Sequence, residues 1–211
     1  MDEMEDLIRR KDWEFLVKNF LPVNFVDSLT FTEVMHLVGN LMVASTDEVE
    51  RGSFLSDVLR DFAVNLMIIL RANDPVEWRA DWKNEAFLGV ACNFVFREAE
   101  GFTYIKNAFM GLEDPPQSLI FAYVSAGSGC PRFLTREEAA QLIQKASDKG
   151  ATCESSQRMV MLAVEMGWKE KEEFWRGKAK ELEKKNIHTP VITPDVLKSM
   201  YKLEEGYQHE K

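Results

Sequence analysis

Histidine and cysteine are scarce in this chain, which has three of each among its 211 residues. The cysteines, Cys92, Cys130 and Cys153, are odd in number and form no C-x-x-C motif, which disfavours both a disulfide framework and a zinc finger. Two of the three histidines, His188 and His209, lie near the C-terminal end, so a Ser–His or Cys–His catalytic pair has few candidates. We therefore expect a reducing, cytoplasmic compartment, no cofactor and no enzymatic activity.

A surplus of positive charge is also missing. The formal net charge is −9 and the isoelectric point is about 5.0. A protein that contacts many phosphates needs a basic face, and the lysines between Lys169 and Lys185 are interleaved with glutamates, as on a solvated helix. The sequence predicts neither a nucleic acid nor a membrane as partner.

Long apolar runs are absent. The longest, Phe62 to Leu70, is interrupted by Asn65 and is too short to span a bilayer. The first residues, Met1 to Asp6, are acidic where a signal peptide would be basic and then apolar. Both features favour a soluble, cytoplasmic protein.

Strand signals are weak, since we find neither alternating β-branched runs nor an Asn-Gly or Asp-Gly hairpin turn. Helix-start signals are abundant instead. Thr30, Ser45 and Thr135 each precede a glutamate by three residues, which forms a capping box. Asp74-Pro75 and Asp114-Pro115 each place an acceptor before a proline at the first helical position. The sequence predicts an all-α fold.

The predicted starts at Thr30, Asp74, Asp114 and Thr152 follow one another at intervals of 38–44 residues. Intervals of this size, each holding two helices, are typical of an α-solenoid. We predict one domain over residues 1–187, with a capping helix at about 3–20 that ends before Pro22. Four helical hairpins follow, at 30–44 with 47–71, 75–98 with 102–111, 115–126 with 135–149, and 153–166 with 169–185. Residues 188–211 are predicted to form an extended segment and a short helix at about 195–205, packed on the domain or on a neighbour.

The third predicted hairpin carries a family-like pattern. Phe121-Ala122 lies in the first helix, and Ala139, Ile143 and Ala146 follow in the second with an alanine, large apolar, alanine spacing. This pattern resembles the tetratricopeptide repeat over about thirty residues, with an inserted loop at 127–131. The fourth hairpin does not keep it, because Trp175 and Ala179 fall out of place. The resemblance implies a similar way of packing helices, without assigning the chain to that family.

Two acidic patterns allow a metal hypothesis. Glu33 and His36 are spaced as in the helical motif of di-iron bundles, although only one copy is present. Asp57 and Asp61 lie one turn apart on another predicted helix and could bind a cation. The commoner explanations are a histidine bonded to a loop and a solvated helix face. A helical metal protein or enzyme using these four residues is the alternative function.

Aromatic and amide side chains suggest a binding surface. Residues 101–131 hold many large apolar side chains and few charges, which fits either a core hairpin or an exposed groove. The leading hypothesis is a non-catalytic protein-interaction module, a scaffold, adaptor or chaperone-like binder of a peptide or partner helix. Its groove is predicted to be lined by Asn65, Trp78, Trp82, Asn93, Arg97 and Tyr123. A third hypothesis is a homo-oligomeric structural protein, a homodimer held through the C-terminal segment.

Overall fold

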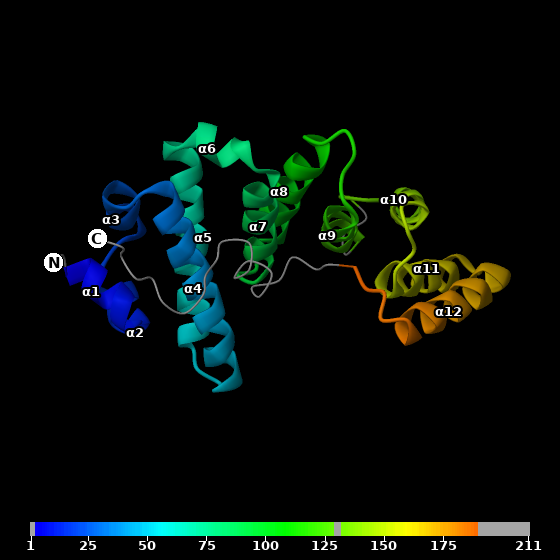
Figure 1. The fold of residues 1–211 in the computed structure, drawn as a ribbon, viewed down its shortest axis with the longest axis horizontal. Helices are drawn as coiled ribbons and strands as arrows, with labels where there is room; N and C mark the ends of the chain where they lie inside the picture. Colours follow the sequence, from blue (N-terminus) through cyan, green and yellow to red (C-terminus); the bar gives the residue numbers. More distant parts are fainter. Residues whose placement is uncertain (1–2, 129–131, 190–211) are drawn as a thin grey trace. The chain divides into compact units, whose positions relative to one another are not determined.

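The computed structural model describes residues 3–128 and 132–189. This part of the chain forms twelve α-helices and contains no strand (Figure 1), which confirms the predicted all-α class. It divides into two compact units, an N-terminal unit that ends at Arg97 and a C-terminal unit that begins at Glu98. Among the described residues, no helix has the length and apolar character needed to cross a bilayer.

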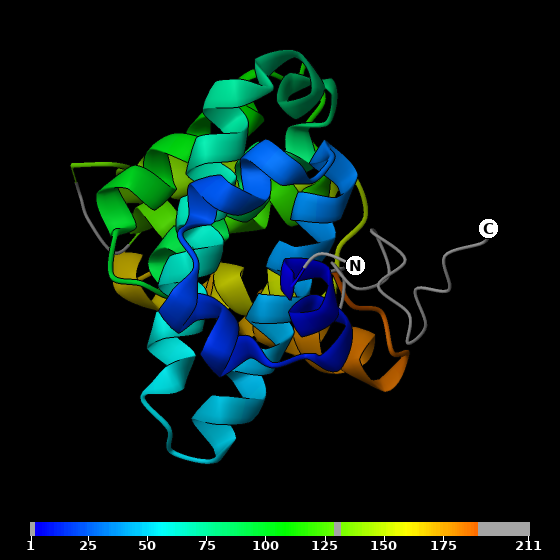
Figure 2. The ribbon, with the colours of Figure 1, turned by 90° about the vertical axis from the view of Figure 1, so that its left-hand side faces the viewer.

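The N-terminal unit contains α1 to α7. Its helices are α1 (Glu3–Arg10), α2 (Trp13–Asn19), α3 (Pro22–Ser28), α4 (Phe31–Glu50), α5 (Leu55–Asn73), α6 (Pro75–Ala80) and α7 (Trp82–Asn93). Helices α4 and α5 lie side by side (Figure 2), and α5 also contacts α2, α3, α6 and α7. Leu59, Leu66 and Leu70 of α5 are fully buried. Helix α5 is therefore the centre of this unit.

The predicted capping helix at 3–20 is wrong in one respect, because it is two helices. Lys11 adopts a left-handed backbone, with φ +57°, and the Asp12 carboxylate accepts from the Phe15 N–H to start α2. Pro22 then occupies the first turn of a further helix, α3, which was not predicted. A proline disfavours helix in the residue before it but is well tolerated at the first helical position.

The first hairpin is present with a different turn. Thr30 and Glu33 form the predicted capping box, but α4 continues through Ser45, where a second start was predicted. The Ser45 hydroxyl donates to the Met42 carbonyl at 2.7 Å, so it bonds backward within α4 instead of capping a new helix. The turn comes later, at Gly52, whose φ of +67° suits glycine.

The predicted helix at 75–98 is also two helices. Pro75 begins α6 as expected, although the Asp74 side chain makes no capping bond. Helix α6 ends at Ala80, because Asp81 caps α7 by accepting from the Lys83 N–H at 2.9 Å. A cap inside the predicted helix was overlooked.

The C-terminal unit is a chain of neighbouring pairs. Its helices are α8 (Glu98–Met110), α9 (Gln117–Ser128), α10 (Arg136–Asp148), α11 (Cys153–Met166) and α12 (Lys169–Lys184), and each contacts the next. The third and fourth predicted hairpins correspond to α9 with α10 and α11 with α12. Thr135 and Thr152 cap α10 and α11 as predicted. Asp114 does not cap α9, since its carboxylate pairs with Lys149.

The chain after α12 returns to the start of α11. The Cys153 N–H donates to the Ile187 carbonyl at 2.9 Å, and the Thr189 N–H donates to Glu154 at 2.8 Å. His188 Nδ1 lies 2.6 Å from the same carboxylate. The hydrogen bond from Thr189 helps to hold the pKa of Glu154 below its usual value, although burial opposes it. The rest of the segment predicted at 188–211, including the short helix at about 195–205, lies outside the described residues.

Gly127 provides a test of the contact between α8, α9 and the loop before α10. A Cβ atom there would lie 2.8 Å from Leu134 Cβ and 2.9 Å from Phe102 Cε2. We expect Gly127→Ala to destabilise the protein by about 1–2 kcal/mol, because overpacking outweighs the gain in helix propensity. Gly177 of α12 has no atom within 4 Å of such a Cβ, so Gly177→Ala should stabilise by about 0.5–1 kcal/mol. Urea unfolding measures both, and equal signs would contradict the packing argument.

Candidate functional site

The six predicted groove residues divide between the two units. Asn65 is half-buried on α5 and donates to Asp61 at 3.0 Å. Trp78 is 2% exposed, and its indole N–H donates to Glu85 at 2.6 Å. Trp78 is therefore a core residue of the N-terminal unit in this structure, without the exposure that a partner contact requires.

The other four predicted residues have different surroundings. Trp82 begins α7 and is half-buried, Asn93 ends α7 and is exposed, and Arg97 follows and is half-buried. Tyr123 belongs to α9 of the C-terminal unit and lines a pocket. The structure does not bring the six together as one surface within either unit.

The four residues of the metal hypothesis have other contacts. Glu33 accepts from Thr30, Asp57 Oδ1 lies 3.9 Å from an Arg60 nitrogen, and Asp61 accepts from Asn65. Burial lowers the pKa of His36, against the opposing charge of Glu33. In the two described ranges, no three His, Cys, Asp or Glu side chains gather as metal ligands would. The arrangement therefore gives this alternative no support.

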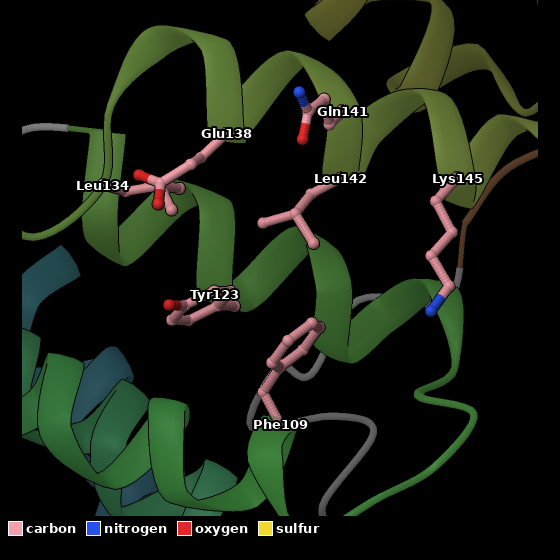
Figure 3. Close-up of a pocket in the computed structure, with 7 residues that line it drawn as sticks. All are labelled: Phe109, Tyr123, Leu134, Glu138, Gln141, Leu142 and Lys145. Atoms are coloured by element: carbon pink, nitrogen blue, oxygen red, sulfur yellow. The ribbon is translucent and has the colours of Figure 1, made fainter.

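A pocket of about 350 Å³ lies between α8, α9 and α10 of the C-terminal unit. Phe109 comes from α8, Tyr123 from α9 and Leu134 from the loop before α10 (Figure 3). The remaining wall is one face of α10, because its residues recur at helical spacing: Glu138, Gln141, Leu142 and Lys145. The pocket therefore has an apolar floor and a polar wall.

Four stacked rings support this pocket. Phe133 stacks on Phe102 at 4.7 Å between ring centroids, Phe102 on Tyr123 at 5.3 Å and Tyr123 on Phe109 at 4.6 Å. The interplanar angles are 11°, 17° and 16° in the same order. Phe102 is buried, whereas Phe109 is half-buried at the pocket end. Each aromatic pair of this kind adds about 0.5–1.5 kcal/mol beyond its buried area, which stabilises this arrangement of the pocket wall.

Glu138 and Tyr123, two titratable groups of the pocket, differ in their hydrogen bonds and in their protonation at neutral pH. The Glu138 carboxylate accepts from the Thr135 N–H and hydroxyl, both at 2.9 Å, and these bonds hold its pKa below the usual value. Burial, and then the charge of Glu138, raise the pKa of Tyr123. At neutral pH the pocket therefore presents an ionised carboxylate already bonded within its capping box and a protonated phenol.

Most of these residues were missed by the sequence analysis, which named Tyr123 and the 101–131 window. In that window Phe102, Ile105, Leu119 and Ile120 are buried, whereas Met110 is 69% exposed and Tyr104, Phe109 and Phe121 are half-buried. The missed signal was the mixed polar and apolar face of α10 at positions 138, 141, 142 and 145. That spacing shows that the four residues lie on one face of the helix. It does not show which other helices lie against that face.

Comparison of the chain with protein-family models, with curated proteins and with solved structures gives no match in any of the three.

Proposed function

We propose that this chain is a non-catalytic protein-interaction module that binds a segment of a partner protein in the pocket between α8, α9 and α10. The observation that carries the proposal is the pocket itself, with an aromatic wall fixed by stacking next to polar groups on one face of α10. Pockets that combine an apolar lining with a few placed polar groups are the usual form of a binding site. The volume of about 350 Å³ suits a side chain or two from a short segment.

The partner is proposed to be a protein and not a nucleic acid, because the net charge of −9 opposes phosphate binding. The proposed compartment is reducing and cytoplasmic. Cys92 and Cys153 are both buried, and burial raises the pKa of the Cys153 thiol. Buried thiols of this kind pack as small apolar groups.

A repeat-like packing of α9 on α10 belongs to the same proposal. Ala139, Ile143 and Ala146 are all buried, as the resemblance to the tetratricopeptide repeat implies for its second helix. Small residues at such positions allow two helices to approach closely. The groove residues Asn65, Trp82, Asn93 and Arg97 remain a hypothesis for the N-terminal unit.

Site-specific crosslinking tests the proposal. A photoreactive residue is placed at position 141, on the pocket face of α10, or at position 144, which does not line the pocket. In a lysate of the source cells, we expect a protein identified by mass spectrometry to be crosslinked from position 141 and not from 144.

The adduct should also depend on the aromatic wall. Phe109→Ala should weaken capture of the same protein about tenfold or more, as expected of an interface anchor. Equal labelling from both positions, or labelling that Phe109→Ala leaves unchanged, would contradict binding in this pocket.

A further inference from the structure

The ring stack ends at Phe133 and at Phe109, both half-buried, and the Phe109 end lines the pocket. Phe109 stacks on Tyr123 and, within the described part of the chain, on no other ring. Its half-buried side chain lines the pocket. A flat ring from a ligand can lie against Phe109 in the offset geometry that the protein's own rings use. An aliphatic side chain fills the same space without that geometry.

Three polar side chains of the pocket can donate hydrogen bonds to a ligand, and two of them, Gln141 and Lys145, are exposed to water. The Tyr123 hydroxyl, the Gln141 amide and the Lys145 ammonium form no hydrogen bond within the described residues. Tyr123 is 8% exposed, and its hydroxyl is not one of the buried side-chain atoms that lack a partner in the described residues, so it opens into the pocket. A ligand in the pocket can therefore accept hydrogen bonds from these side chains in place of water.

The charged side chains of the pocket favour a ligand with a negative charge at one end. Lys145 lowers the pKa of Asp114 through space, but Asp114 takes its hydrogen bond from Lys149, so Lys145 forms no ion pair within residues 3–128 and 132–189. At the other end of the α10 face, Glu138 is bonded to Thr135 and lies in the field of Lys106. Glu138 and Lys145 are seven residues apart, about 10 Å along the helix. A ligand carboxylate at the Lys145 end of the pocket would therefore lie next to a cation and away from the Glu138 carboxylate.

We infer that this pocket recognises an aromatic side chain with a carboxylate next to it, as in an aromatic–acidic peptide segment. This inference rests on the proposed function. The aromatic ring of the ligand stacks on Phe109 and contacts Leu134 and Leu142. The carboxylate pairs with Lys145. The donors of Tyr123 and Gln141 bond carbonyl or carboxylate oxygens of the same segment.

Small probes test the inference by NMR titration of the full chain. The first probe is N-acetyl-Phe-Glu-amide. The matched probes replace glutamate by glutamine, which removes the charge, or phenylalanine by cyclohexylalanine, which keeps the apolar bulk but removes the flat ring. We expect the first probe to shift amide signals of α8, α9 and α10, and each matched probe to bind about threefold to tenfold more weakly.

Variants then assign each preference to a residue. Lys145→Gln should abolish the preference for glutamate over glutamine, and Phe109→Leu should abolish the preference for phenylalanine over cyclohexylalanine. Gln144→Ala, outside the pocket, should preserve both. Equal affinity for all three probes, or signal changes confined to other helices, would overturn the inference. If the probes give that result but the crosslink from position 141 is still seen, the proposed function stands and only the aromatic–acidic partner is excluded.

Discussion

Replacing Phe102 by alanine is expected to lower the free energy of unfolding of the C-terminal unit by about 3–5 kcal/mol. Phe102 is 5% exposed and lies between two rings of the stack, Phe133 and Tyr123. Its removal leaves a cavity and two ring faces without a partner. The ring also touches the backbone position of Gly127, so α8, α9 and the loop before α10 all lose contact at once.

Hydrogen exchange measured by mass spectrometry is the appropriate readout, because it reports the loss of protection for each helix. Faster exchange is expected in α8, α9 and α10. The matched variant Phe102→Leu retains much of the apolar volume and should cost less, about 1–2 kcal/mol. If both variants cost the same, the ring stack contributes little and the stability argument for this residue is wrong. The alanine variant should also lose binding in the pocket, since Tyr123 and Phe109 depend on the same stack.

Replacing Glu85 by alanine is expected to destabilise the N-terminal unit by about 2–3 kcal/mol. One Glu85 oxygen accepts from the Trp78 indole at 2.6 Å, and both oxygens accept from Arg71 at 2.9 and 3.0 Å. These three residues join α5, α6 and α7. Trp78 is almost fully buried, so its N–H would lose a partner that water cannot replace.

The Arg71 contribution is smaller than its two bonds suggest. The Arg71 side chain is 41% exposed, and solvent screens such an ion pair. Glu77→Ala on the exposed side of α6 is the control, with an expected change below about 0.5 kcal/mol.

A double-mutant cycle isolates the bond to the indole. In a Trp78→Phe background, Glu85→Ala should cost about 1–2 kcal/mol less than in the wild-type chain. Chemical denaturation of the four proteins gives the coupling energy. A coupling near zero would show that the short contact between Trp78 and Glu85 adds nothing to stability.

Helix starts were predictable where the signal is local. Thr30, Thr135 and Thr152 cap helices as their sequences indicate, because the bond runs to a backbone N–H only three residues away. Ser45 and Asp114 carry similar signals and do not cap. Ser45 bonds to Met42 and accepts from Arg60 Nε of α5, and Asp114 pairs with Lys149 of the α10 end. In both cases a partner outside the local motif takes the side chain.

The candidate site was less predictable than the fold. Trp78 and Tyr123 are both aromatic residues on helices, and both were predicted to line a groove. The sequence near Trp78 does not show that Glu85 would take its N–H, nor does the sequence near Tyr123 show that Phe102 and Phe109 would stack on either side of it. Such contacts depend on which helix faces lie together.

The sequence by itself determined that the described chain is helical and where most of its helices begin, because periodicity and capping act within a few residues. Only the tertiary structure decided which aromatic side chains between positions 101 and 128 are buried, as Phe102 is, and that Phe109 lies half-buried at an open pocket edge. It also decided that the polar face of α10 meets that edge. Burial and stacking join residues up to tens of positions apart, and no local pattern records which of them will meet.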